Sequence, residues 1–145
     1  MKVRPSAIII ENNHLLLLRY NYGGNDVFAL PGGNIDTGET LTQALQRELS
    51  EELGIEAEIS ELLFVGEVIL PNQKDTLHCC FATKIIAEIP ILNPKETTAL
   101  EVVWKNIMTL HDINLYPNIG DAIQDSMLMG HSTVYLGKIE QAYFG

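Results

Sequence analysis

Three glutamates, Glu48, Glu51 and Glu52, lie in a segment whose apolar residues recur at helical spacing, which predicts a helix over residues 41–53. The apolar side of this helix is formed by Ala44, Leu45, Leu49 and Leu53. With about 3.6 residues per turn, Glu48 and Glu52 fall inside that apolar side and Glu51 falls at its margin. Carboxylates are rarely buried without a partner, so these positions require a positive group nearby.

A metal ion supplies that charge better than the chain does. Arg47 is the cation beside the three carboxylates, and Glu48 and Glu52, one helical turn apart, repel each other. Mg²⁺ (or Mn²⁺) binds carboxylate oxygens and keeps positions open for water and phosphate. A solvated acidic helix face is the common alternative, but it does not explain carboxylates on the apolar side. The pattern therefore predicts a divalent metal site.

The residues before the helix point to a phosphate ligand. Gly32, Gly33 and Gly38 allow a close approach of the backbone to a ligand, and the loop leads into a helix N-terminus. Thr40 and Gln43 form a capping-box pattern, and Gly54 suits the left-handed position after the helix. A glycine loop followed by a carboxylate helix predicts a diphosphate site.

Residues 33–55 read Gly, five residues, Glu, seven residues, then Arg-Glu-Leu-Ser-Glu-Glu-Leu-Gly-Ile. This segment resembles the Nudix box of the Nudix hydrolase (MutT-like) superfamily at every defined position. The preceding Phe-Ala-Leu-Pro-Gly-Gly (28–33) and the later Glu-Val-Val-Trp (101–104) are also similar to segments of that family. The resemblance implies an α/β (α+β) fold, a Nudix-type α/β/α sandwich with a mixed central β-sheet.

The resemblance also implies a Mg²⁺- or Mn²⁺-dependent enzyme that hydrolyses a pyrophosphate bond in a nucleoside diphosphate linked to another moiety. Carried over by position, Glu48 and Glu52 are the principal metal ligands, Glu51 is a further ligand or water-binding group, and the carbonyl of Gly32 is a backbone ligand. Arg47 orients the carboxylates.

The general base stays open among Glu52, Glu96 and Glu101, because the family takes it from the box or from a later glutamate. Glu101, which opens a strand, ranks ahead of Glu96 here. The catalytic group predicted from the sequence is therefore Glu51, Glu52, Arg47 and Glu101.

On the substrate side, the candidates are Arg4 and Arg19 for phosphate, Phe28 for stacking on a base, Gly33 for close backbone approach, and Glu39 in support of the metal shell. Both an NTP or dNTP and an ADP-ribose-like nucleotide stay open as substrates. A non-catalytic Nudix-fold sensor that binds a nucleotide is the alternative, although such a module is expected to have lost box carboxylates that this chain keeps.

The rest of the chain predicts one domain over residues 1–145. Strands are expected at 3–10, 15–20, 27–30, 55–70, 76–86, 100–104 and 134–136, a hairpin turn at 11–14, a loop at 22–26, and a second helix at 117–129. The aromatic tail, residues 135–144, is expected to dock on the domain or on a second subunit, which leaves a homodimer open.

Composition narrows the partners and the location. The net charge of −10 disfavours binding to long nucleic acid, and a small nucleotide is the expected ligand. We expect no membrane span and no signal peptide, and a cytoplasmic protein. The adjacent Cys79 and Cys80 are expected to be buried on opposite faces of a strand rather than bridged.

Overall fold

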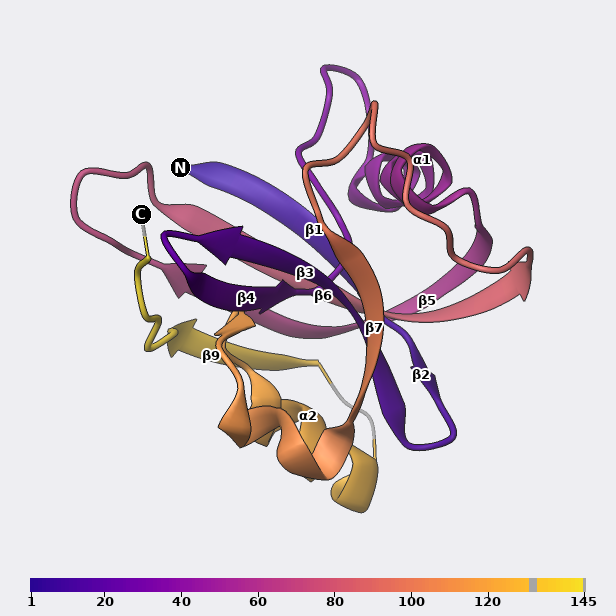
Figure 1. The fold of residues 1–145 in the computed structure, drawn as a ribbon. Coiled ribbons are helices and arrows are strands. Elements are labelled where there is room, and N and C mark those ends of the chain that lie inside the picture. The colour runs from indigo at the N-terminus through magenta and orange to yellow at the C-terminus, as the bar shows by residue number, and fades with distance from the viewer. Residues whose placement is uncertain (131–132, 145) are drawn as a thin grey trace.

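The computed structural model describes residues 1–130 and 133–144, and its strands form two curled sheets (Figure 1). The four-stranded sheet has the order β1 (Lys2–Ile8), β6 (Thr76–Ala87), β5 (Glu56–Val68) and β9 (Val134–Lys138). The five-stranded sheet has the order β2 (Ile10–Glu11), β3 (His14–Tyr22), β4 (Asn25–Ala29) and β8 (Leu115–Tyr116), with β7 (Glu101–Asn106) paired to β3. Both sheets mix parallel and antiparallel pairs.

Helices cover the strands on two sides. Figure 1 shows α1 (Leu41–Leu53) on one side, and α2 (Gly120–Met129) with the 3₁₀-helix η1 (Ile107–Asp112) on the other. The predicted α/β class and helix-flanked arrangement are confirmed, with the mixed sheet divided into two. No helix in the described residues is long and apolar enough to span a membrane.

The bounds of α1 match the prediction because local signals set them. Thr40 Oγ1 accepts a hydrogen bond from Gln43 N at 3.2 Å, and Thr40 N donates to Gln43 Oε1 at 2.9 Å. Gly54 ends the helix in the left-handed conformation, with φ of 66°, and its N–H donates to Ser50 O. The capping box and the glycine stop are therefore confirmed.

Strand β3 lies at the centre of the core and is buried on both faces. Leu15 and Leu17 pack into the cluster beneath α2, whereas Leu16 and Leu18 pack into the cluster beneath α1. All four are at most 1% exposed. Successive strand residues point to opposite faces, so a run of four leucines fits a strand between two apolar layers.

The prediction of one strand over residues 3–10 is wrong, because the structure divides this segment into β1 and β2. β1 pairs in parallel with β6, and the chain then leaves that sheet at Ile9, so that β2 can pair with β3. The predicted hairpin is present at this second junction, where Asn12 and Asn13 both have positive φ (50° and 61°). The pairing of β1 with a strand some seventy residues away overrides the continuous β pattern.

The predicted loop at 22–26 is also wrong, because β3 runs to Tyr22 and β4 begins at Asn25. The glycines between them, Gly23 and Gly24, have φ of 60° and 90° and form a tight turn. The second helix begins at Gly120 instead of residue 117, because β8 pairs with β4 just before it and the chain must first turn. The sequence pattern did not predict the short elements β8 and η1.

Strand β6 carries buried groups on both of its faces. Cys79 packs in the α1-side cluster and Cys80 in the α2-side cluster, both as free thiols, as predicted. His78 is 0% exposed, lies edge-on to the Tyr116 ring, and has no hydrogen-bond partner for either ring nitrogen among the described residues. Burial, together with the charges of Arg4 and Lys2, lowers the pKa of His78 to about 3.

His78 should make the fold sensitive to acid. The unfolded imidazole binds a proton near pH 6.5, whereas the folded one does so near pH 3, so the unfolded state binds more protons between these values. The free energy of unfolding should therefore fall as pH drops through this window, by at most about 1.4 kcal/mol per pH unit from this group. Urea denaturation from pH 7 to pH 5 should show a smaller loss for His78→Leu than for the wild type. A His14→Gln control should behave like the wild type, and equal losses in all three proteins would contradict this prediction.

Candidate active site

The loop that leads into α1 is fixed against β1. Ala7 N donates to Pro31 O at 2.8 Å, Gly33 N donates to Pro5 O at 3.2 Å, and Ser6 forms a bridge with Gly32. A Cβ on Gly32 would lie 2.3 Å from Pro5 O, so no larger residue fits without moving the loop. This contact joins the two sheets at the start of the loop that leads into α1.

Gly33 lies directly against the carboxyl group of Glu48. A Cβ built on Gly33 would lie 2.3 Å from Glu48 Cδ and 2.6 Å from both of its carboxylate oxygens. The space that the glycine leaves is therefore filled by Glu48, which is held between the loop backbone and α1. Gly33, predicted as a substrate contact, acts in this structure by making room for a predicted metal ligand.

Arg47 contacts carboxylates from α1 and from the loop that precedes it. Its Nε and Nη2 donate to the two oxygens of Glu39 at 2.8 and 3.0 Å, and Nη1 donates to Glu48 at 3.0 Å and to Glu51 at 3.2 Å. Nη2 also donates to the carbonyl of Asn34 at 3.0 Å. The hydrogen bonds from Arg47 lower the pKa of Glu39. The Arg47 guanidinium is thus placed to orient these carboxylates toward a further ligand.

Glu52 points inward and lies apart from this network. It is 9% exposed, and its carboxylate has no hydrogen bond or ion pair to any residue that the structure describes. Burial first, and the charge of Glu48 second, raise the pKa of Glu52 to about 7. Burial also raises the pKa of Glu48, although Arg47 opposes the shift. The inward direction predicted for both side chains from the helical wheel is therefore confirmed.

A cavity of about 360 Å³, here called the Glu52 cavity, opens beside this carboxylate; it is lined by Tyr20, Glu52 and residues 94–98. The loop that carries Glu96 is fastened to the last turn of α1, because Ile91 N donates to Leu53 O at 3.0 Å and Asn93 N donates to Glu52 O at 2.8 Å. These two bonds bring Glu96 to the same cavity as Glu52. Its charge contributes to the raised pKa of Glu52.

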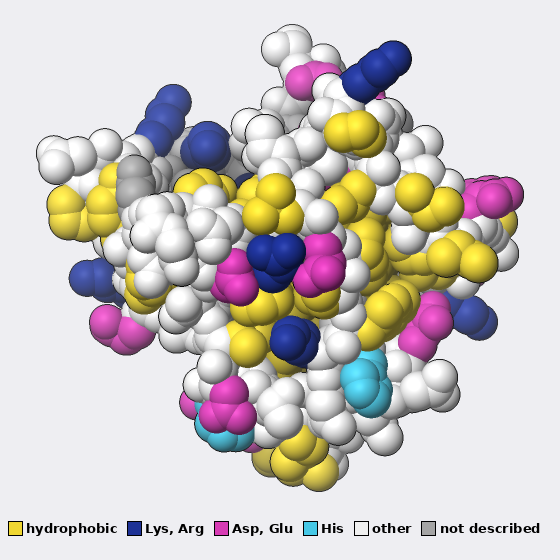
Figure 2. All heavy atoms as spheres, in the orientation of Figure 1, with side chains coloured by type: hydrophobic (Ala, Val, Ile, Leu, Met, Phe, Trp, Pro, Cys, Tyr) yellow, Lys and Arg dark blue, Asp and Glu magenta, His cyan; other side chains and the backbone are white. Residues whose placement is uncertain are grey.

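Three sequence-predicted residues lie elsewhere. Glu101 pairs with Arg19 at 3.0 Å, and Arg19 also pairs with Asp26 at 3.2 Å. Figure 2 shows basic and acidic side chains side by side on the face over β3, β4 and β7, the strands that carry this group. Phe28 is 8% exposed and belongs to the core beneath α2. Neither Arg19, Glu101 nor Phe28 lines the Glu52 cavity.

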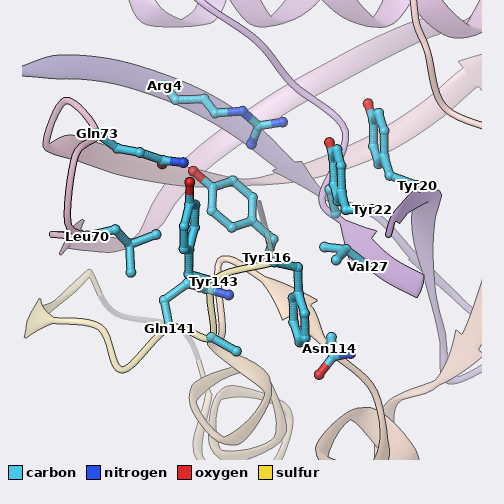
Figure 3. Close-up of a pocket in the computed structure, with 13 residues that line it drawn as sticks. Arg4, Tyr20, Tyr22, Val27, Leu70, Gln73, Asn114, Tyr116, Gln141 and Tyr143 are labelled. Carbon is cyan, nitrogen blue, oxygen red and sulfur yellow. The ribbon is translucent and has the colours of Figure 1, made fainter. Parts of the chain in front are cut away.

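A second cavity, here called the aromatic cavity, has a volume of about 420 Å³ and lies between β1, β3, β4, β8 and the end of the chain (Figure 3). Its lining includes Arg4, predicted from sequence, together with Tyr22, Tyr116 and Tyr143, which were not. Tyr20 lines both cavities, so they are neighbours. The expected docking of the aromatic tail on the domain is confirmed by the contacts of Gln141 with Leu115 and Asn118. The clustering of aromatic residues in the tail was the sequence feature that could have indicated this cavity.

The residues around Glu52 suit a divalent cation. A buried carboxylate without a partner, beside a second one whose position a glycine secures, supplies the oxygen ligands that Mg²⁺ prefers. In the described part of the chain no three acidic, histidine or cysteine side chains already form a metal cluster. Arg47 bonds Glu48 through Oε1 and Glu51 through Oε2, so the second carboxylate oxygen of each has no hydrogen bond to a described residue.

The comparisons with known proteins agree with this geometry. The NUDIX domain family model matches residues 1–126, and the chain belongs to this family. It is 41% identical over 64 residues to an ADP-ribose pyrophosphatase of Methanocaldococcus jannaschii, over 43% of this chain and 38% of that protein. It is 35% identical over 89 residues to a putative 8-oxo-dGTP diphosphatase of Mycobacterium tuberculosis, over 61% of this chain and 60% of that protein.

Among solved structures, a NUDIX hydrolase from Nitrosomonas europaea superposes with a TM-score of 0.72 at 20% identity, covering 92% of this chain and 93% of that one. This likeness shows the shared fold. The aligned segments span 38% and 60% of the two curated relatives, less than two thirds of each, whereas the fold is shared over 92% of this chain.

Gly33→Ala should weaken divalent-cation binding. The added methyl group needs the space that the Glu48 carboxylate occupies, so Glu48 must move away from the loop. We expect the dissociation constant for Mn²⁺, measured by isothermal titration, to rise by about 10-fold or more, in the range of a disturbed ligand shell. Asn34→Ala, which alters an exposed neighbouring side chain, is the matched control. Equal Mn²⁺ affinity in Gly33→Ala and the wild type would contradict the role given to this glycine.

Proposed function

We propose that this protein is a divalent-metal-dependent hydrolase that cleaves a pyrophosphate bond in a nucleoside diphosphate derivative. The observation that carries the proposal is the buried, partnerless carboxylate of Glu52 beside Glu48, at a cavity that adjoins a second cavity with aromatic walls. Hydrolase names among the relatives support the same chemistry. Both a nucleoside triphosphate and an ADP-ribose-like nucleotide remain candidate substrates.

Glu48, Glu51 and Glu52 would hold Mg²⁺ or Mn²⁺, with the carbonyl of Gly32 as a further ligand. When bound, the cation neutralises the diphosphate and lowers the pKa of the attacking water. Arg47 keeps Glu48 and Glu51 oriented through its fixed fork of N–H donors. Glu39 in turn fixes Arg47 with two hydrogen bonds. Arg4, expected from the sequence to contact a phosphate, lines the aromatic cavity and not the Glu52 cavity.

Glu96 is the general base that the geometry favours. It lies on the loop bound to the end of α1 and lines the same cavity as Glu52, which is where a proton acceptor for the attacking water is needed. Glu101, which the sequence ranked ahead of Glu96, is engaged by Arg19 on the surface of β3 and β7. Glu52 is itself assigned to the metal, which leaves Glu96 to accept the proton.

A substrate screen tests the proposed activity. Phosphate release, coupled to a phosphatase, should be followed over NTPs, dNTPs, oxidised dNTPs, ADP-ribose, NADH, nucleotide sugars and dinucleoside polyphosphates, with Mg²⁺, Mn²⁺ or chelator. Glu52→Gln should lower kcat by at least about 100-fold, since losing a ligand exceeds the loss typical of an outer contact. Glu58→Gln, on an exposed position of β5, is the control. Nucleotide binding without turnover in the wild type would show a sensor instead.

The assignment of the base is tested by a pair of variants. Glu96→Gln should lower kcat by roughly 10²- to 10⁴-fold with little change in KM, because a proton acceptor is lost while the substrate contacts remain. Glu101→Gln should stay within a few-fold of the wild type, since its partner is Arg19. The opposite pattern, measured by steady-state kinetics on the best substrate of the screen, would move the role to Glu101.

A further inference from the structure

Strand β7 forms an edge of the five-stranded sheet. It pairs with β3 along one side in an unbroken antiparallel register, and no strand of the described residues pairs with its other side. Figure 1 shows β7 on the outside of the fold, in front of β3. An edge strand presents unpaired N–H and C=O groups, which makes it a template for a further strand.

The hydrogen-bonding pattern shows which backbone groups of β7 are free. Ile107 N, directly after the strand, donates to Asn13 O at 3.0 Å in continuation of the register with β3. Because bonded residues alternate along an antiparallel pair, every second residue back from Ile107 faces β3 and the residues between them face away. Those of Val102 and Trp104 are thus directed outward, and they make no hydrogen bond to a residue that the structure describes.

Most of the other sheet edges are covered or interrupted. The loop at 31–33 is hydrogen-bonded along β1, and β9 contains a register shift and Gly137 with a φ of 69°. The part of β5 beyond β9 has further register shifts and carries three glutamates, whereas β2 and β8 have two residues each. In contrast, β7 has six residues, no proline and no register shift, so it is a regular strand left open to pairing.

We propose that β7 is the interface through which two copies of this chain form a dimer, by antiparallel pairing of β7 with β7 of the second copy about a two-fold axis. The inference concerns assembly and does not depend on the proposed activity. A two-fold contact uses the same surface on both subunits, so β7 must be complementary to its own sequence read in the opposite direction.

One register satisfies both the backbone and the charges. Pairing the outward-facing Val102 with Trp104 of the second copy allows these residues to exchange hydrogen bonds, and it places Val103 opposite itself on the axis. Glu101 then lies opposite Lys105 of the second copy, and this ion pair occurs twice. Moving the partner strand by two residues in either direction, which keeps the outward groups facing each other, loses both ion pairs.

The overall charge of the chain makes this match important. Each copy carries a net charge of −10, so two copies repel each other unless their contact is apolar or matched in charge. Arg19 Nε donates to Glu101 Oε1 at 3.0 Å. The Nζ atom of Lys105 lies 4.9 Å from the centre of the Phe28 ring. Both charged side chains of β7 are therefore held against their own sheet, at the two ends of the strand.

Apolar side chains complete the surface beside this edge. Val102 and Trp104 are only partly buried against the α1-side cluster, and Val103 is partly buried against the α2-side cluster. Leu100, directly before the strand, is 56% exposed. Figure 2 shows hydrophobic side chains gathered beside β7, between it and the right-hand ends of β5 and β6. A second strand along β7 would cover apolar area as well as the free backbone groups.

Charge-reversal variants test the contact. Glu101→Lys places lysines opposite each other in both ion pairs, and Lys105→Glu places glutamates opposite each other. Sedimentation velocity over a concentration series should show a dimer for the wild type and a dissociation constant at least about 10-fold higher for each variant, since two attractive pairs become repulsive. Glu58→Lys, at an exposed position of β5, is the control and should dimerise as the wild type does.

An equal mixture of the two variants separates a lost contact from a damaged fold. In a mixed dimer each introduced or native lysine faces a glutamate, so the mixture should associate within a few-fold of the affinity of the wild type. Each variant alone should stay largely monomeric at the same concentration. A mixture that associates no better than its components would overturn the proposal.

Disulfide cross-linking tests the register. Val103→Cys places two thiols opposite each other at a non-hydrogen-bonded pair, where Cα atoms lie about 4.5 Å apart, within reach of a disulfide. Val102→Cys, which lies opposite Trp104 in this register, is the control. The native Cys79 and Cys80 are buried. Mild oxidation should give a covalent dimer of the Val103→Cys protein and not of the control, as seen by non-reducing electrophoresis.

Three results would overturn the proposal. A wild type that stays monomeric up to about 100 μM would do so, because interfaces of ordinary size bind at micromolar concentrations or below, and the edge would then serve another partner or none. A dimer that neither charge reversal weakens would use a different surface. Cross-linking of Val102→Cys instead of Val103→Cys would show a different register.

Discussion

Arg47 supplies the positive charge that allows acidic side chains to share one small region of the fold. Its guanidinium reaches Glu39, Glu48 and Glu51 together with the carbonyl of Asn34, so its N–H groups fix both the loop and the helix. A lysine, with a single compact charge, could not make these contacts in one plane. The repulsion among Glu39, Glu48 and Glu51 is thereby offset, while Glu52, one helical turn after Glu48, is buried and has no hydrogen bond or ion pair to a described residue.

The two cavities depend on the same central strand. β3 is buried on both faces at its leucines, and its last residues project from the core, where Tyr20 contributes to both cavities. The hydroxyl groups of Tyr20 and Thr97 are hydrogen-bonded at 3.3 Å, which connects β3 to the loop that carries Glu96. The loop that carries Glu96 and the walls of both cavities are therefore positioned by contacts to this rigid strand of the core.

The parts of this structure that sequence predicts well are those with local causes. Thr40, Gln43 and Gly54 set the ends of α1, and the helical period alone shows that Glu48 and Glu52 point inward. The division of the first strand into β1 and β2 could not be predicted from the sequence, because it follows from the pairing of β1 with β6. The aromatic cavity has the same difficulty, since it is assembled from segments at both ends of the chain that no short pattern connects.

The ranking of Glu101 over Glu96 illustrates the same limit. Both are isolated glutamates in sequence, and nothing local shows that Arg19 lies opposite Glu101 in the register of β3 and β7. Likewise, no periodicity reveals that the loop after β6 is bound to the end of α1. Only these long-range contacts show that Glu101 belongs to a surface ion pair, whereas Glu96 lines a cavity.

The loop after β6 is hydrogen-bonded to the final carbonyls of α1, so the loop and the last turn of the helix depend on each other. The carbonyls of Glu52 and Leu53, which a helix normally exposes at its end, are taken up by the backbone of residues 91–93. If the last turn of the helix frays, Glu52 loses its place and the Glu96 loop loses its attachment in the same event. The order of this one turn therefore determines whether Glu52 and Glu96 line the same cavity, and local unfolding there would displace both together.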